Sequence, residues 1–112
     1  MRQQLDCSNW NDENGNPAGG RVDATGITIT WQNGPMKAPE GDPIGQNGAF
    51  VEGILMAALQ RLEYYQKSPF KCYENAGALE HVHAALECLD SRTRDREAKG
   101  VEGTHGQRAS EG

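Results

Sequence analysis

The segment 91–97, SRTRDRE, places Arg92, Arg94 and Arg96 within five positions of a chain whose formal net charge is -5. A planar guanidinium donates several N–H bonds at once and fits the oxygen pairs of phosphates and carboxylates. Arg92 and Arg96 are four residues apart, so on a helix two like charges would share a face, which costs a few tenths of a kcal/mol. An anion held between them would turn that repulsion into attraction. The spacing therefore indicates a candidate phosphate site.

The same arginines also have an ordinary structural interpretation. Cations near the C-terminus of a helix complement its dipole, and each contributes about 0.3–1 kcal/mol. Three nearby acids, Glu87, Asp90 and Asp95, could also pair with them. The residues alone leave anion binding and helix stabilisation both open.

Aromatic residues surround the turn predicted within RLEYYQKSPFKCYEN, residues 61–75, namely Tyr64, Tyr65, Phe70 and Tyr73. Aromatic side chains at a helix–helix turn usually pack the end of the hairpin. One of them could instead stack on a nucleobase, and Asn75 offers the paired donor and acceptor that an adenine edge requires. Tyr65 is the best candidate because it continues an apolar stripe past Leu62 to the rim of that stripe.

Apolar periodicity predicts the helices that position these residues. From residue 49 to about Gln66 apolar residues recur at steps of three and four, with Asn47 as the expected cap and Ser68-Pro69 closing the helix. A second helix is predicted from about 73–75 to Lys99, where Gly100 ends it. The expected apolar stripes are Val51, Ile54, Leu55, Ala58, Leu59 and Leu62 in the first helix and Leu79, Val82, Leu86 and Leu89 in the second.

The first half of the chain reads as β structure and loops. ITITWQ, from Ile27, alternates apolar and polar residues as a half-buried strand does. Residues 8–26 are dense in Asn, Asp and Gly and predict a mobile loop, and residues 36–48 predict a second loop or a short edge strand. The expected fold is α+β, with a small N-terminal antiparallel β region (1–48), a C-terminal two-helix hairpin (49–100) and a tail (101–112), one domain overall.

Composition indicates a thin core and a small-molecule ligand. The chain has 112 residues, of which 36% are hydrophobic, and its mean hydropathy is -0.77. Chains this small and polar often complete their hydrophobic core with residues of a partner chain, so we expect an oligomer. The net negative charge argues against bulk binding of DNA or RNA, which requires a basic surface. Any nucleotide bound here should be small and held in a pocket.

The sequence contains no recognisable catalytic or metal-binding pattern. Cys7, Cys72 and Cys88 form no CxxC pair, which argues against a disulfide framework or a zinc site and suits a reducing cytosol. His81 and His83 are two apart, not the four apart of a helical metal pair. No signal peptide is evident, and the apolar stretch near 54–59 is too short to span a bilayer. We therefore expect a binding protein without a cofactor.

Helix geometry constrains any site that combines these residues. Asn75 and Arg92 are 17 residues apart on one predicted helix, about 25 Å at 1.5 Å per residue. A dinucleotide-sized ligand cannot easily reach both. If the aromatic, the amide and the arginines form one site, they come from two chains, and an antiparallel dimer with two equivalent sites is expected.

Four segments, ITWQNGPMK, GQNGAFVEGILMAALQRLEYYQ, SPFKCYEN and LDSRTRDREAKGVEGTH, together resemble the first described family of phage-encoded Thoeris anti-defence sponges. The similarity covers about residues 27–105, and RTRDREAKGVEGTH is its most distinctive part. The resemblance implies a protein without enzymatic activity in the cytoplasm of the infected bacterial host. Such a sponge captures, without cleaving, the cyclic ADP-ribose signals (glycocyclic ADP-ribose) made by TIR-domain proteins of Thoeris immunity.

The resemblance also implies an assembly and a set of binding residues. Members form dimers or hexamers built from dimers, and some hexamers hold cyclic trinucleotides of the CBASS pathway at separate sites. Carried over residue by residue, the binding set is Tyr65 for base stacking, Asn75 for the base edge, Arg92 and Arg96 for the pyrophosphate and Asp95 for a ribose hydroxyl, with Arg61 and Thr93 as weaker candidates for the trinucleotide site. Tyr65 departs from the phenylalanine expected in the family by one hydroxyl group.

Two other functions remain compatible with the residues. A protein-binding adaptor could dock an acidic partner on the basic end of the second helix. A hydrolase of cyclic nucleotides is the third alternative, although the sequence supplies no obvious general base for it.

Overall fold

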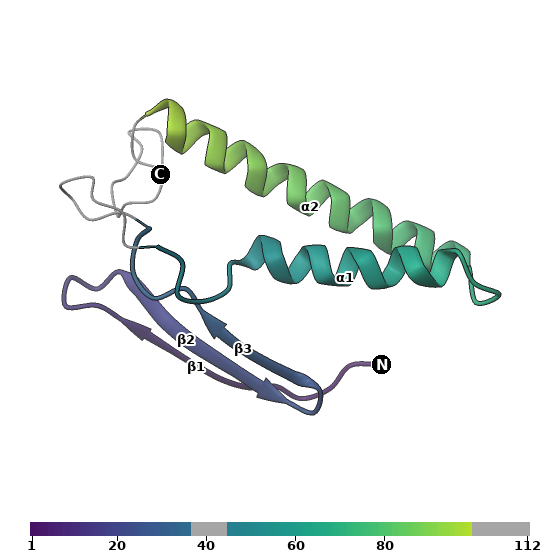
Figure 1. Ribbon diagram of the computed structural model, residues 1–112, viewed down its shortest axis with the longest axis horizontal. Helices are drawn as coiled ribbons and strands as arrows, with labels where there is room; N and C mark the ends of the chain where they lie inside the picture. The colour runs from purple at the N-terminus through teal and green to yellow at the C-terminus, as the bar shows by residue number, and fades with distance from the viewer. Residues whose placement is uncertain (37–44, 100–112) are drawn as a thin grey trace. The chain divides into compact units, whose positions relative to one another are not determined.

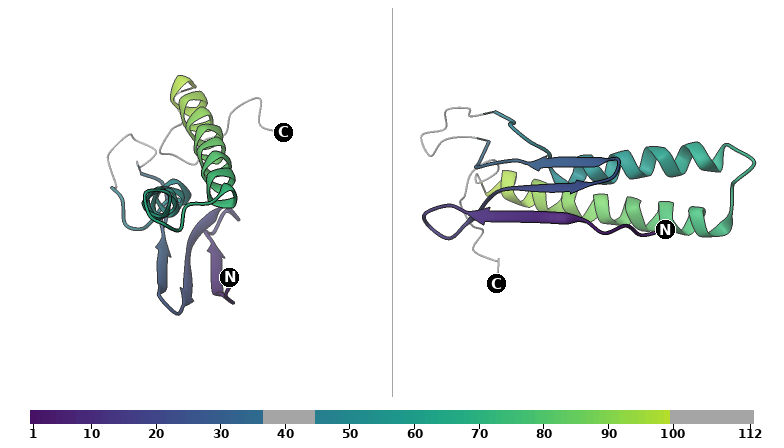
Figure 2. Two further views of the ribbon diagram at one scale, coloured as in Figure 1. Left: turned by 90° about the vertical axis from the view of Figure 1, so that its right-hand side faces the viewer. Right: turned by 90° about the horizontal axis from the view of Figure 1, so that it is seen from below.

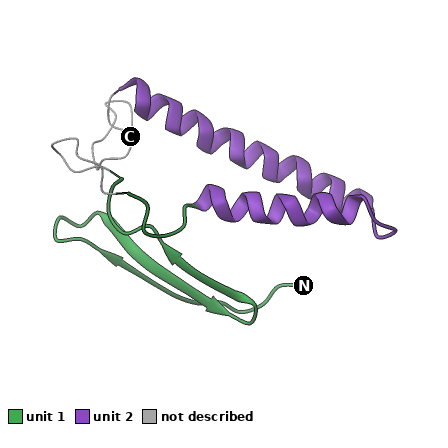
Figure 3. Ribbon diagram, in the orientation of Figure 1, with its two compact units in different colours: residues 1–50, 101–112 green, residues 51–100 purple. Residues whose placement is uncertain are grey.

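The computed structural model describes residues 1–36 and 45–99 of the chain. The chain divides into two compact units, one containing Met1–Phe50 and the other Val51–Gly100 (Figure 3). The first unit contains three strands and the second contains two helices. This order confirms the predicted α+β class, a small antiparallel β region followed by a helical hairpin.

The first unit is an antiparallel sheet in which β1 (Asp6–Asn11), β2 (Pro17–Ala24) and β3 (Ile27–Trp31) lie in the order β1-β2-β3 (Figure 1). Val22 pairs with Cys7 on one side and with Ile29 on the other. Because alternate residues of a strand point to opposite faces, Val22, Ile29 and Trp31 share one face. Val22, 7% exposed, is the one buried apolar residue among those that the structure describes.

The predicted mobile loop over residues 8–26 is wrong, because β1 and β2 occupy most of it. Its polar residues build a hairpin turn instead. The Asp12 carboxylate accepts hydrogen bonds from the backbone N–H groups of Asn14 and Asn16, both at 2.9 Å, and Gly15 supplies the positive φ of 79°. A Cβ atom at Gly19 would come within 2.7 Å of the Trp10 indole, so this glycine makes room for the cross-strand tryptophan. The predicted strand from Ile27 is confirmed.

The second unit is a helical hairpin formed by α1 (Val51–Gln66) and α2 (Tyr73–Ala98), which lie side by side and join at one end (Figures 1 and 2). Cys72 caps α2, its Sγ accepting from the Asn75 N–H at 3.4 Å, and Lys99 ends the helix. The second predicted helix is confirmed closely, and the first begins two residues later than expected. The residues of the predicted stripes that are half-buried are Leu55, Leu59, Leu62, Leu79, Val82, Leu86 and Leu89.

The hairpin buries little of its apolar surface in this single chain. No residue of α1 is buried, and the one buried residue of the described part of α2 is Arg96. Val51, Ile54 and Ala58, also predicted to lie on the apolar stripe of α1, are exposed. The thin core expected from composition is therefore observed.

Asn47 does not cap α1, contrary to the prediction. Its side-chain Oδ1 accepts from the Asn33 N–H at 2.7 Å, and its Nδ2 donates to the Asn33 carbonyl at 2.9 Å. The Gln32 Oε1 accepts from the N–H groups of Asn47 and Gly48 at 2.8 and 3.2 Å. We call Gln32, Asn33, Asn47 and Gly48 the amide clamp. It holds the chain beside the end of β3, where Trp31 and Ala49 form a parallel bridge.

Residues 36–48 were predicted to form a loop or a short edge strand, and the described part, residues 36 and 45–48, agrees with the loop because it lies in no strand. Residues 37–44 lie outside the described residues, as do the predicted helix stop at Gly100 and the predicted tail, 101–112.

Candidate functional site

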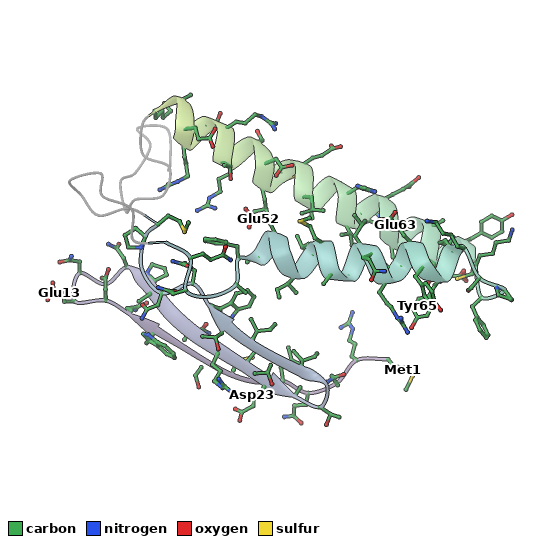
Figure 4. The ribbon with its side chains drawn as sticks, viewed as in Figure 1. Met1, Glu13, Asp23, Glu52, Glu63 and Tyr65 are labelled. Carbon is green, nitrogen blue, oxygen red and sulfur yellow. The ribbon has the colours of Figure 1, made fainter. Side chains whose placement is uncertain are left out.

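Four aromatic residues surround the turn between α1 and α2, namely Tyr64, Tyr65, Phe70 and Tyr73. Tyr65, near the end of α1, is labelled in Figure 4. The Arg61 guanidinium stands over two rings, 5.0 Å from the Tyr64 centroid and 4.9 Å from the Tyr65 centroid. Tyr65 is 36% exposed, whereas Phe70 and Tyr73 are 77% and 94% exposed. The aromatics therefore do not bury the end of the hairpin in this chain, and their rings remain available to a ligand or another protein.

Hydrogen bonds within the turn hold Tyr65 and Asn75 on either side of it. The Gln66 side chain accepts from the Cys72 N–H at 3.0 Å and donates to the Cys72 carbonyl at 3.1 Å. Ser68 adds a second tie, since its Oγ donates to the Tyr65 carbonyl and accepts from the Phe70 N–H. Asn75 is half-buried in the first turn of α2, and its side-chain amide bonds to none of the described residues. That amide is therefore free to pair with a ligand.

The basic segment occupies the far end of α2, where the two candidate pyrophosphate ligands differ in exposure. Arg92 is exposed, whereas Arg96 is only 9% exposed. Asp95 and Arg96 each already interact with another group. Thr93 is half-buried and Arg94 is exposed.

This end of α2 extends beyond α1. The helix α2 has 26 residues and α1 has 16. In an antiparallel hairpin, about ten residues at the end of α2, roughly 15 Å of helix, therefore run past the start of α1. The arginines lie on this overhang, so no residue of α1 faces them across the hairpin.

The structure separates the candidate residues into two groups. Tyr65, Asn75 and Arg61 lie near the turn, whereas Arg92 to Arg96 lie at the other end of α2. Because α2 is one uninterrupted helix, the 17 residues from Asn75 to Arg92 span about 25 Å. Arg61 and Thr93, proposed together for a second site, also lie at opposite ends. A single chain therefore brings together neither the residues of the first candidate site nor the Arg61–Thr93 pair of the second.

Two features of the turn were not predicted from the sequence. The stacking of Arg61 on both tyrosines was missed, although the spacing of three and four residues on a helix was a usable signal. Gln66, whose bonds to Cys72 shape the turn, was given no role. No sequence signal marked Gln66, because its partner is the backbone of a residue on the far side of the turn.

The described residues contain no group of three or more His, Cys, Asp or Glu side chains that could hold a metal ion. The three cysteines are free and exposed. Neither described helix combines the length and the apolar character needed to cross a membrane.

Comparison with known proteins identifies a relative. The chain is 41% identical over 78 residues to Thoeris anti-defense 1 from Bacillus phage SBSphiJ7. The aligned region covers 70% of this chain and 51% of the phage protein, so the chain spans about half the length of the curated relative that it matches. No protein-family model matches the chain. The match confirms the resemblance carried by the four sequence segments, and the chain is thus related to the Thoeris anti-defence proteins of phages.

Proposed function

We propose that this protein counteracts Thoeris immunity by binding and sequestering cyclic ADP-ribose signals, such as glycocyclic ADP-ribose, in the cytoplasm of the infected host. The relation to a protein named Thoeris anti-defense supports the biological role. The observation that supports the binding mechanism is that Tyr65 and Asn75 lie near the turn of the hairpin, whereas the arginines lie at the other end of α2. A base-binding half lies at the turn and an anion-binding half lies on the overhang.

The chemistry of each half suits one part of the ligand. At the turn, Tyr65 stacks on the adenine and the unpaired Asn75 amide bonds to its edge. On the overhang, Arg92 and Arg96 bind the pyrophosphate, and Asp95 accepts from a ribose hydroxyl. Arg96 already interacts with another group and is 9% exposed, whereas Arg92 is exposed. Arg92 is therefore the arginine of the pair that can be substituted with less disturbance of the chain's own contacts.

The site is completed by a second chain. A ligand the size of a dinucleotide cannot bridge about 25 Å, so the turn of one chain meets the overhang of another. The hairpin leaves large apolar side chains exposed on α1, among them Val51 and Met56, and these give a partner surface to bury. Two-fold pairing yields two equivalent sites per dimer. Further assembly into hexamers would bring Arg61 and Thr93 of different chains together for a cyclic trinucleotide.

Mixing two inactive variants tests the two-chain site. Tyr65→Ala removes the stacking half and Arg92→Ala removes the anion-binding half, so at a signal concentration near the dissociation constant of the natural protein each homodimer should lose most of its capture. After unfolding and refolding together, mixed dimers contain one intact site and one doubly altered site. We expect capture to return in the mixture, at up to one site per mixed dimer.

The controls make the outcome decisive. Arg94→Ala, which removes an equal charge from the same segment, should keep full capture by itself. If each variant alone still captures the signal, the residue assignment is wrong. If the mixture stays inactive although mass measurement shows mixed dimers, the halves do not belong to two chains. Binding of an acidic protein without any signal depletion would favour the adaptor function instead.

A further inference from the structure

The chain contains three Asn-Gly pairs, Asn14-Gly15, Asn33-Gly34 and Asn47-Gly48. In such a pair the glycine backbone nitrogen can attack the carbonyl carbon of the preceding asparagine side chain. Ammonia leaves, a five-membered succinimide forms, and water opens it to aspartate or isoaspartate. Glycine favours the reaction because no Cβ atom hinders the approach. Hydrogen bonds that engage the glycine N–H or the asparagine amide oppose it, so the structure can rank the three pairs.

Asn47-Gly48 is held at both reacting groups. The Asn47 side-chain amide bonds to the backbone of Asn33 through its oxygen and its nitrogen. The Gly48 N–H donates to the Gln32 Oε1 at 3.2 Å. Moreover, a Cβ atom at Gly48 would come within 2.5 Å of the Trp31 backbone, which shows how closely the chain is packed there. This pair should react slowest.

Asn14-Gly15 is held at one reacting group. The Gly15 N–H donates to the Asp12 carbonyl at 3.0 Å across the β1–β2 turn, so the attacking nitrogen is engaged. The Asn14 side-chain amide makes no hydrogen bond to a residue in the described ranges. This pair should react at an intermediate rate.

Asn33-Gly34 has both reacting groups unengaged by the residues that the structure describes. Within residues 1–36 and 45–99, neither the Asn33 side-chain amide nor the Gly34 N–H has a hydrogen-bond partner, and Asn33 is exposed. The clamp bonds of Asn33 use only its backbone groups. From this difference we propose that Asn33 is the preferred site of spontaneous deamidation in this protein.

The modification acts on the amide clamp. The Asn33 N–H and carbonyl are the two groups with which the Asn47 amide pairs, at 2.7 and 2.9 Å. Isoaspartate routes the main chain through the former side chain, so the Asn33 carbonyl becomes a free carboxylate and the carbonyl that continues the chain lies one carbon further from the N–H. The chain between Asn33 and Gly34 is thereby lengthened and redirected, and the two groups that pair with the Asn47 amide no longer belong to one ordinary main-chain residue. Isoaspartate at Asn33 therefore breaks the bonds to the Asn47 side chain, and it also shifts the neighbouring Gln32, whose Oε1 accepts from the N–H groups of Asn47 and Gly48, so these two N–H groups should exchange faster with solvent.

Ageing the purified full-length protein in a mildly alkaline buffer tests the ranking by peptide mass spectrometry. The peptide containing Asn33 should gain one mass unit several-fold sooner than that containing Asn14, and the peptide containing Asn47 should change last. Aged samples should contain isoaspartate as well as aspartate at Asn33, which identifies the succinimide route, and heavy-oxygen water should label both products because the hydrolysis takes place during ageing. Equal rates for Asn33 and Asn47, or fastest reaction at Asn14, would overturn the proposal.

Two variants test whether deamidation at Asn33 opens the clamp and whether hydrogen bonding sets the order of the deamidation rates. Asn33→Gln keeps both backbone partners of Asn47 and lengthens the side chain, so the clamp should form but should not open on ageing. Hydrogen exchange at Asn47 and Gly48 should rise with age in the natural protein and stay constant in this variant. Gln32→Ala removes the acceptor of the Gly48 N–H and should speed deamidation of Asn47 several-fold. An unchanged Asn47 rate would show that hydrogen bonding does not set the order.

Discussion

The β unit and the helical unit differ in the contacts that their side chains make within one chain. The β unit buries only one apolar residue among those described, yet its turns are closed by hydrogen bonds in which the side chains of Asp12 and Gln32 accept and that of Asn47 donates. The helical unit has two regular apolar stripes, but α1 buries no residue and the aromatic side chains at its turn are exposed. Specific polar contacts complete the first unit within one chain, whereas the second presents apolar surface that another molecule can cover.

This difference supports the proposal that binding and assembly involve the helical unit. Polar groups that already pair with their own chain have little to gain from a partner. Exposed apolar and aromatic side chains gain free energy when a partner removes them from water. We therefore expect perturbations of the helical unit to change assembly and capture, and perturbations of the β unit to change only its own stability.

The largest expected effect concerns the core that we propose two chains share. Leu59 is only half-buried in one chain, but completion of this core by a partner would raise the cost of Leu59→Ala to about 2–5 kcal/mol. The unfolding temperature of the natural protein should rise with protein concentration, as it does for an obligate oligomer. Thermal unfolding at several concentrations, together with mass measurement in solution, checks both. A concentration-independent transition would place the whole core within one chain.

The next effect concerns the anion-binding half. Arg92→Ala should cost about 1.5–3 kcal/mol of binding, because it removes charge-assisted hydrogen bonds. Capture should weaken on the order of 10- to 100-fold, measured by calorimetry with the cyclic ADP-ribose signal. Arg94→Ala provides the charge-matched control and should change affinity little. Equal losses in both variants would mean that only the net charge of the overhang matters.

Stacking at the turn should give a similar or slightly smaller effect. Tyr65→Ala removes a stacking surface worth about 1–3 kcal/mol per base, and calorimetry should show the corresponding loss of affinity. Tyr65→Phe keeps the ring and should bind nearly as well as the natural protein. If Tyr65→Phe lost as much as Tyr65→Ala, the hydroxyl group would be the recognising element and stacking would not.

Two glycine substitutions should change stability without weakening capture, and they separate the two units; Gly53→Ala gives the smallest effect. At Gly48 a Cβ atom would lie 2.5 Å from the Trp31 backbone, so Gly48→Ala should destabilise the β unit by about 1–3 kcal/mol without weakening capture. At Gly53 in α1 nothing lies within 4 Å, so Gly53→Ala should stabilise the helix by about 0.5–1 kcal/mol. Denaturant unfolding measures both. Destabilisation by Gly53→Ala would instead reveal close approach of a partner chain at that turn of α1.

The sequence predicted the helical unit better than the β unit for a physical reason. Leu79, Val82, Leu86 and Leu89 repeat at helical spacing, and such a pattern is local to its element. The strands β1 and β2 were missed because their Asn and Gly content is typical of loops, while their stability depends on pairing with residues distant in the chain. Asn47 has a side chain suited to capping, and only the position of Asn33 shows that it binds elsewhere.

The part of the candidate site that was predictable is the spacing of its residues along a helix. The rise per residue of a helix is enough to place Asn75 and Arg92 too far apart for one small ligand. The burial of Arg96 was not predictable, because helical spacing does not indicate what surrounds a charged side chain. The exposure of Phe70 and Tyr73 was also not predictable, because these residues lie in the turn and directly after it, where helical periodicity does not indicate which side chains are buried.

Capture without cleavage is the central claim, and one measurement tests it most directly. The purified protein is incubated with the cyclic ADP-ribose signal and filtered, and the signal is assayed in the filtrate before and after the retained protein is heated. The account predicts that the signal disappears in proportion to the number of sites and returns chemically unchanged on heating. Disappearance without return, with product accumulating beyond one equivalent per site, would show an enzyme and contradict the account, as would a signal that never leaves the filtrate.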